Sequence, residues 1–265
     1  MTSPEPTPTC TTATLLGSDE PLCAAYDVAL LDLDGVCFAG EARVPYAADN
    51  VNAARKTGMH LSFVTNNASR APQTVVDKLA ANDIVAAPSE VFSAAMDAAA
   101  MLAEHVDPGS MVLVVGGEGV RQALLDEGFQ VTSSAQDEPV AVVQGWDPAV
   151  DWALLSEGVY AINAGALHVA TNLDATLPTE RGFALGNGSL VAAIVNASGQ
   201  EPLAGGKPFP GIYTRALKRA GGTKPLAIGD RLNTDHVGAR AAGIPGLHVL
   251  TGVSGAREVI TAPAT

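Results

Sequence analysis

The sequence predicts an α/β fold built on a doubly wound parallel sheet, and three observations in its 265 residues support this prediction. Short runs of aliphatic and β-branched residues alternate with longer Ala-rich stretches. The short runs are apolar on both faces, as is typical of parallel strands that helices cover on each side. Several Ala-rich stretches end at a glycine, which suits the left-handed position that commonly follows the last turn of a helix.

Each expected element follows from one of these patterns. Strands are expected at Val28–Leu33, His60–Thr65, Met111–Val115, Val140–Gln144, Leu167–Ala170, Pro225–Ile228 and Leu247–Leu250. Helices are expected at Ala47–Thr57, Ala71–Asn82, Ser89–His105, Val120–Glu127, Trp152–Ala164, Ser189–Ser198 and Phe209–Ala220. In an open parallel sheet, ligands bind beyond the carboxyl ends of the strands, so functional side chains are expected in the loops that follow them.

The charge and the cysteines limit the classes of protein and partner. A formal net charge of −13 repels phosphate backbones and anionic lipid, so neither nucleic acid nor a membrane surface is an expected partner. No apolar run approaches the roughly 20 residues of a transmembrane helix. The spacing of Cys10, Cys23 and Cys37 fits neither a disulfide framework nor a metal site. A secretory signal requires a basic residue near its start, and no lysine or arginine precedes Arg43. We therefore expect a cytoplasmic protein with reduced thiols.

Two carboxylates lie at the end of the first expected strand. In Asp32-Leu33-Asp34-Gly35, the spacing puts both acidic side chains on the same side of an extended chain, and the glycine permits a sharp turn. Like charges this close repel each other unless a cation lies between them, and hard oxygen ligands suit Mg²⁺. A polar turn that caps the strand is the alternative interpretation, and for this segment alone both stay open.

Three later segments also place polar side chains at strand ends or helix starts. Thr65-Asn66-Asn67 offers a hydroxyl and amides that can donate to phosphoryl oxygens. Gly206-Lys207-Pro208 offers an ammonium group, and Gly229-Asp230 with Thr234-Asp235 offers two more carboxylates. Taken singly, each has an ordinary explanation: loop-forming residues, a solvated lysine or a helix-capping aspartate.

Together and in this order, the four segments closely resemble the four motifs of the haloacid dehalogenase superfamily. Further segments are similar to the p-nitrophenylphosphatase branch of that superfamily: Val115–Gly117, Ala170–Asp174, Gly186–Ser189 and Thr251–Ser254. The resemblance extends over most of the chain.

The resemblance implies a Rossmann-like core with an inserted α/β cap. Residues 1–22, rich in Thr, Pro and Ser, are expected to be a flexible tail, 23–92 and 200–265 the catalytic core, and 93–199 the cap domain. Members of the branch usually continue beyond the segment matching Thr251–Ser254 with another strand and helix, so we expect either a shortened sheet edge or a sequence truncated at its C-terminus. Cap-mediated dimers occur in the branch, and a homodimer is compatible with the resemblance.

The resemblance also implies chemical roles. Asp32 would attack phosphorus and form an aspartyl-phosphate, which splits one difficult hydrolysis into two easier steps. Asp34 would protonate the leaving alcohol and then deprotonate water, a role for which partial burial and the neighbouring carboxylate would raise its pKa. Mg²⁺ would be held by Asp32, the backbone carbonyl of Asp34 and Asp230.

The remaining core residues would bind the phosphoryl group and balance its charge. The phosphate-binding residues that the resemblance implies are Thr65, Asn66, Asn67 and Lys207. Lys207 is also expected to be catalytic, because it would neutralise charge on the nucleophile and the phosphoryl oxygens. Asp235 and Asn233 would orient Lys207 or a metal-bound water from further out.

Residues 172–186 are expected to form a cap loop over the leaving group. The specificity candidates in this loop are Asn172, Asp174 and Arg181. An ordinary surface loop is the alternative, in which Arg181 pairs with Glu180 rather than with a second anionic group of a substrate.

Two features of the sequence bear on the substrate. Thr176–Gly182 is most similar to actinobacterial members of the branch that act on glycerol 3-phosphate, and Leu177 stands where its pyridoxal-phosphate phosphatases carry a histidine. Asp34 resembles the phosphatases rather than the transport ATPases or the dehalogenases. We therefore predict a Mg²⁺-dependent phosphatase for a small phosphorylated metabolite, glycerol 3-phosphate or a similar ester. The alternatives are a phosphatase for 2-phosphoglycolate, sugar or nucleotide phosphates, a phosphotransferase, and a non-catalytic phosphometabolite-binding protein.

Overall fold

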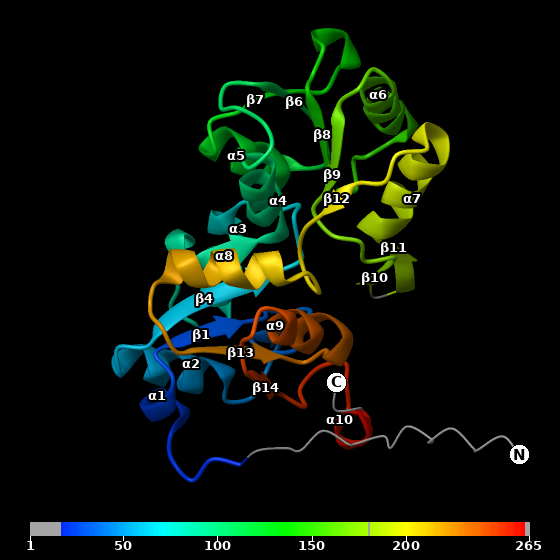
Figure 1. Ribbon diagram of the computed structural model, residues 1–265. Helices are drawn as coiled ribbons and strands as arrows, with labels where there is room; N and C mark the ends of the chain where they lie inside the picture. The colour runs from blue at the N-terminus through cyan, green and yellow to red at the C-terminus, as the bar shows by residue number, and fades with distance from the viewer. Residues whose placement is uncertain (1–16, 180, 263–265) are drawn as a thin grey trace, which may run out of the picture.

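The computed structural model describes residues 17–179 and 181–262, which contain two five-stranded parallel sheets (Figure 1). The core sheet has the strand order β14-β13-β1-β4-β5, and the cap sheet has the order β12-β9-β8-β6-β7. Two antiparallel hairpins, β2-β3 and β10-β11, complete the strands. The strands are β1 Val28–Leu31, β2 Phe38–Ala39, β3 Ala42–Arg43, β4 His60–Thr65, β5 Val91–Ser93, β6 Met111–Val115, β7 Gln130–Thr132, β8 Ala141–Gln144, β9 Leu167–Ala170, β10 Thr176–Thr179, β11 Gly182–Leu185, β12 Leu203–Ala204, β13 Pro225–Gly229 and β14 Gly246–His248.

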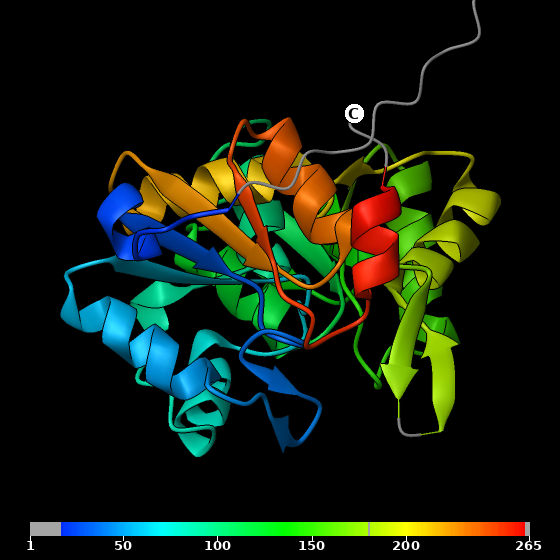
Figure 2. The ribbon, with the colours of Figure 1, turned by 90° about the horizontal axis from the view of Figure 1, so that it is seen from below.

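Helices cover both faces of each sheet. The helices of the described residues are α1 Leu22–Ala25, α2 Ala47–Lys56, α3 Pro72–Ala81, η1 Pro88–Glu90, α4 Ala94–Leu102, α5 Glu118–Asp126, η2 Ala135–Asp137, α6 Trp152–Asn163, α7 Asn187–Ser198, α8 Pro210–Ala220, η3 Leu232–His236, α9 Val237–Ala241 and α10 Ala256–Thr261. Figure 2 shows α8 and α9 on one side of the core sheet and α2 on the other. In the described part of the chain, no helix combines the length and apolar character needed to cross a membrane.

The first strand shows why the core forms three layers. All of β1 is buried, and its side chains alternate between the two faces of the sheet. Val28 and Leu30 pack into a cluster that includes Ile212 of α8, whereas Leu31 packs on the opposite face with Val51 of α2 and residues of α3. Burying each leucine side chain contributes about 1.5–3 kcal/mol, and this apolar strand therefore favours a central position.

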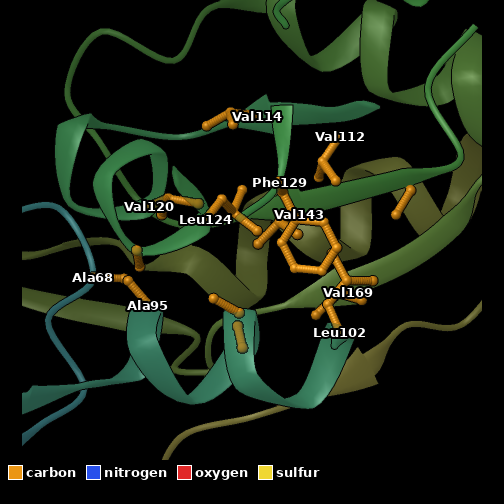
Figure 3. Packing of buried hydrophobic residues seen from close by; sticks show 14 of the residues in the cluster. Ala68, Ala95, Leu102, Val112, Val114, Val120, Leu124, Phe129, Val143 and Val169 are labelled. Carbon is orange, nitrogen blue, oxygen red and sulfur yellow. The ribbon is translucent and has the colours of Figure 1, made fainter. Parts of the chain in front are cut away.

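The cap has its own hydrophobic core (Figure 3). Helices α4 and α5 cover one face of the cap sheet, where Phe129 and Leu124 pack with Leu102 and Val143. Helices α6 and α7 cover the other face around Leu113. The predicted fold class, a doubly wound parallel core with an inserted α/β cap, is confirmed. The boundaries of the cap at residues 93 and 199 stay a prediction.

Some expected elements differ from the structure. The helix expected at Ser89–His105 is wrong at its start, because Val91–Ser93 are buried and extend the core sheet beside β4. The loop expected at 172–186 contains the β10-β11 hairpin. Of the expected tail 1–22, residues 1–16 lie outside the described residues, and Leu22 begins the short helix α1.

Candidate active site

The carboxyl edge of the core sheet holds a buried lysine between two carboxylates. Lys207 is 3% exposed, and its Nζ donates to Asp32 Oδ1 at 2.5 Å and to Asp235 Oδ1 at 2.8 Å. Asp32 directly follows β1, and Asp235 lies in η3 after β13, so neighbouring strands bring them together. Burial alone would lower the pKa of Lys207, but the two carboxylates raise it well above its usual range.

The two carboxylates differ in their acidity. Burial raises the pKa of Asp32 to about 7, with Asp235 adding to the rise and Lys207 opposing it. Burial would also raise the pKa of Asp235, but the contact with Lys207 lowers it below its usual value. Asp32 is thus the carboxylate that needs further positive charge to be ionised at neutral pH.

Asp230 supplies the third carboxylate, and its surroundings fit a divalent cation. The residue is 1% exposed, its Oδ2 accepts a hydrogen bond from Val253 N at 2.6 Å, and its buried Oδ1 has no partner among the described residues. One carboxylate oxygen each from Asp32, Asp230 and Asp235 lies within 4.8 Å of the others. A buried oxygen without a partner is costly, and a cation such as Mg²⁺ would satisfy it.

Glycines make room for this acidic cluster. A Cβ on Gly252 would lie 1.9 Å from Asp230 Oδ2, and one on Gly35, where φ is +84°, would lie 2.6 Å from the same atom. The hydroxyl of Thr251 in turn donates to the Gly35 carbonyl at 2.6 Å. The Thr251–Ser254 segment therefore holds Asp230 in place from the opposite side.

The end of β4 and the loop after it hold three of the predicted phosphate-binding residues, Thr65, Asn66 and Asn67. Thr65 Oγ1 accepts a hydrogen bond from Asn67 N at 3.1 Å, which leaves its proton free to donate into the pocket. The Asn67 side chain instead accepts from Ser69, so it organises the loop. The Asn66 side chain pairs with both backbone groups of Lys207, at 2.7 and 3.0 Å.

The core edge opens into a pocket of about 330 Å³ that residues of the cap line from the other side. From the cap, Asn172 Nδ2 donates to the Asn66 carbonyl at 2.9 Å, and Asp174 Oδ2 accepts from Asn66 Nδ2 at 2.9 Å. The pocket is lined by Asp32, Asp34, Gly40, Thr65, Asn66, Asn67, Ala68, Trp146, Asn172, Asp174, Thr176, Leu177, Pro178, Gly186, Asn187, Lys207, Arg231, Thr234 and Asp235.

Comparison with known proteins gives the family. A model described as haloacid dehalogenase-like hydrolase matches residues 29–130, and one described as HAD-hydrolase-like matches residues 204–265. The chain is 36% identical to 5'-nucleotidase YutF of Bacillus subtilis, over 86% of this chain and 89% of that protein. The chain belongs to the haloacid dehalogenase-like hydrolases. This confirms the resemblance that the four motifs carry.

Other relatives in this family are also phosphatases. The chain is 42% identical to D-glycerol 3-phosphate phosphatase of Mycobacterium tuberculosis, over 89% of this chain, and it spans 66% of that protein's length. The glycerol phosphate phosphatase of M. tuberculosis solved with magnesium superposes with a TM-score of 0.86 at 41% identity, covering 92% of this chain and 73% of that one. The predicted enzyme class and the predicted Mg²⁺ cofactor are thereby confirmed for the family.

The structure does not bring every predicted residue of this hydrolase into the site. Asp34 lines the pocket, but its side chain is exposed rather than partly buried, and its Oδ1 accepts only a 3.4 Å bond from Gly40 N. Asn233 and Arg181 are exposed and do not line the pocket. Their predicted roles remain predictions without a contact in the described chain to support them.

Sequence reasoning missed two pocket residues of chemical interest. Trp146 follows β8 and Arg231 follows Asp230, and both are half-buried against the pocket. The rule that ligands lie beyond strand ends could have found them, because each follows an expected strand by two or three residues. Trp146 presents an aromatic face, and Arg231 adds a second cation to the lining beside Lys207.

Proposed function

We propose that the chain hydrolyses small phosphate monoesters through an aspartyl-phosphate on Asp32, with Mg²⁺ as cofactor. One observation carries this proposal. Asp32 and the buried ammonium of Lys207 line one pocket in contact with each other, and Asp230, which has an unpartnered buried oxygen, lies in the same cluster of carboxylates as Asp32. Bound Mg²⁺ would supply positive charge that favours the ionised form of Asp32 and offsets the phosphate dianion. The metal would be held by Asp32, Asp230 and the backbone carbonyl of Asp34, and the Asp235 carboxylate belongs to the same acidic cluster.

The proposed reaction has two chemical steps, each assigned to residues of the pocket. The Asp32 carboxylate attacks phosphorus in line, the bond from phosphorus to the ester oxygen breaks, and Asp34 gives its proton to the leaving alcohol. Asp34 then removes a proton from water as the water attacks the phosphoryl group, which releases inorganic phosphate and regenerates Asp32. Thr65 and the backbone amide of Asn66 would hold the phosphoryl oxygens, and Lys207 would stabilise charge at the reacting carboxylate.

For the substrate, we propose glycerol 3-phosphate or an ester of similar size. The pocket volume supports a small leaving group, and Asn172, Asp174 and Thr176 offer polar groups to alcohol hydroxyls. The mycobacterial relative named D-glycerol 3-phosphate phosphatase supports the same choice. Esters of 2-phosphoglycolate, sugars and nucleotides are the competing substrates.

The test is phosphate release from p-nitrophenyl phosphate with and without Mg²⁺. We expect turnover that requires the metal and is lost in Asp32→Asn. Binding of phosphate esters without turnover would contradict the proposal and favour a phosphometabolite-binding protein. A panel of glycerol, glycolate, sugar and nucleotide phosphates would then rank the substrates by kcat/KM, and added glycerol as an acceptor would reveal a phosphotransferase.

A further inference from the structure

A carboxylate outside the pocket lies fully buried where the cap joins the core. Asp97 is 0% exposed and belongs to α4, whose apolar residues pack against the cap sheet. A buried charge is costly unless it is paired and hydrogen-bonded. Burial accordingly raises the pKa of Asp97, while its hydrogen-bond partners oppose the rise. The hydrogen-bond partners of Asp97, Gly206 and Arg215, indicate its role in the structure.

Asp97 contacts two segments that are distant in sequence. Its Oδ2 accepts a hydrogen bond from Gly206 N at 2.8 Å, and its Oδ1 accepts one from Arg215 Nη1 at 2.8 Å. Arg215 lies on α8, which covers the core sheet beside α4 (Figure 1). A Cβ on Gly205 would stand 2.8 Å from Asp97 Oδ2, so only glycine lets the backbone approach this closely.

The segment that Asp97 holds leads directly into the active site. Gly206 follows β12, the last strand of the cap sheet, and precedes Lys207. The peptide groups around Lys207 are therefore held from two sides, by Asp97 on the cap-packed helix and by the Asn66 side chain on the core. The Lys207 ammonium reaches Asp32 at 2.5 Å, and a displacement of about 1 Å at such a contact can cost about 10²-fold in rate.

We propose that Asp97 is a positioning residue for the reaction: through Gly206 it fixes the backbone of Lys207, and through Arg215 it ties the cap-packed helix to the core. This inference rests on the proposed function. Asp97 does not line the pocket, so its effect on the reaction is indirect, through the Gly206 backbone and the adjoining Lys207. The competing interpretation is a buried ion pair that stabilises the α4–α8 contact and nothing else.

The first test compares kcat and KM in matched variants. Asp97→Ala is expected to lower kcat by about 10- to 100-fold and to change KM by less than about threefold, because Lys207 would act on the reacting groups rather than on ground-state binding. Asp97→Asn keeps an acceptor oxygen for Gly206 N but turns an amide N–H toward Arg215, so it is expected to recover part of this loss. Glu104→Gln is the control: Glu104 is 59% exposed and binds the other side of Arg215 at 2.8 Å without touching Gly206, so its kcat should stay within about twofold. A loss in Glu104→Gln equal to that in Asp97→Ala, or a change in KM alone, would contradict the proposal.

A double-mutant cycle with Lys207→Met separates positioning from general stabilisation. If Asp97 acts through Lys207, Asp97→Ala should lower kcat in the native background and cause no further loss in the Lys207→Met background. Equal losses in both backgrounds would show that Asp97 acts independently of Lys207.

Amide hydrogen exchange tests the hydrogen bond from Gly206 N to Asp97 without a measurement of activity. In Asp97→Ala, exchange of the Gly206 amide should accelerate, while amides elsewhere on α4 and α8 stay protected. Unchanged exchange at Gly206, or acceleration spread evenly over both helices, would overturn the assignment. If the wild-type chain releases no phosphate, the proposed function fails, whereas the exchange measurement still decides whether Asp97 holds Gly206.

Discussion

The core sheet and the cap sheet are both parallel, five-stranded and covered by helices on two faces, yet their carboxyl edges differ in chemistry. The core edge gathers buried charged groups, with Lys207 in contact with Asp32 and Asp235. The cap edge presents mainly neutral groups to the same pocket; among the described cap residues Asp174 is the one carboxylate of the lining, and it is hydrogen-bonded to Asn66. This difference supports the proposal that the core breaks the ester bond while the cap shapes the space for the leaving group.

The largest expected effect comes from the core nucleophile. Asp32→Asn should lower kcat by on the order of 10³-fold or more, because an amide cannot form the covalent intermediate. Asp174→Asn, which changes a carboxylate of the same pocket on the cap side, should cost less than about 30-fold. Steady-state kinetics with p-nitrophenyl phosphate measures both losses. Equal losses of kcat would contradict the proposal that the core carries the chemical step and the cap only shapes the space for the leaving group.

Lys207 should give the next largest effect. Lys207→Met is expected to lower kcat by about 10²- to 10³-fold, since the ammonium that offsets developing charge is lost. Lys207→Arg should not restore the rate, because a planar guanidinium does not fit a site that is 3% exposed and shaped for a compact ammonium. Full activity in the arginine variant would show that positive charge alone, without this geometry, is sufficient.

The raised pKa of Asp32, about 7 in the metal-free protein, predicts a link between protons and Mg²⁺. Mg²⁺ binds the ionised carboxylate, so its apparent affinity should rise by up to about tenfold per pH unit below pH 7, with proton release on binding. Calorimetry in buffers of different ionisation enthalpy measures this release. A pH-independent affinity between pH 5 and pH 7 would contradict the link.

The same shift fixes the sign of a stability effect. The folded pKa of Asp32 lies above the unfolded value, so the metal-free folded state binds more protons between roughly pH 4 and pH 7. The free energy of unfolding of the metal-free protein, relative to Asp32→Asn, should therefore fall as pH rises through this window, and saturating Mg²⁺ should offset the fall. Denaturant titrations across the window would test it, and a rise with pH would have the wrong sign.

On the cap side, a smaller effect on binding is expected. Trp146→Ala should raise KM by about 5- to 30-fold with little change in kcat, because its aromatic face would bind substrate and transition state alike. Trp152, which is 79% exposed on α6 and outside the pocket, gives the matched control. A loss of kcat in Trp146→Ala without a change in KM would assign the residue to the chemical step instead.

The smallest expected effect is at Arg181. Its side chain is exposed and outside the pocket, so Arg181→Ala should leave kcat/KM within about twofold for glycerol 3-phosphate and for 2-phosphoglycolate. A selective loss for 2-phosphoglycolate, which carries a second anionic group, would restore the role that the sequence predicted.

The sequence could predict a site residue where the residues next to it mark the end of a strand, and it could not predict one whose partners are distant in the sequence. Asp32 and Asp230 directly follow strands of clear apolar pattern and Thr65 ends another, so their meeting at one sheet edge follows from parallel topology. Asp97 carries no such signal, because its partners Gly206 and Arg215 are 109 and 118 residues away, and only the packing of α4 brings them together.

The β10-β11 hairpin was also beyond the reach of the sequence pattern. Its residues are mostly exposed, so no buried alternation marks the strands, and the segment was expected to be a loop. Asp34 illustrates the opposite error, since the acid–base role that the resemblance implies called for partial burial of a side chain that the turn at Gly35 leaves exposed.

The central claim is that Asp32 becomes phosphorylated during turnover, and trapping the intermediate tests it most directly. The enzyme with Mg²⁺ and ³²P-labelled phosphate ester is quenched in acid within the first turnover, digested, and its peptides are sequenced by mass spectrometry. We expect the label on the peptide containing Asp32, acid-stable and labile to hydroxylamine, and absent from Asp32→Asn. Turnover with label on another residue, or an Asp32→Asn variant that still becomes labelled and releases phosphate, would contradict the account.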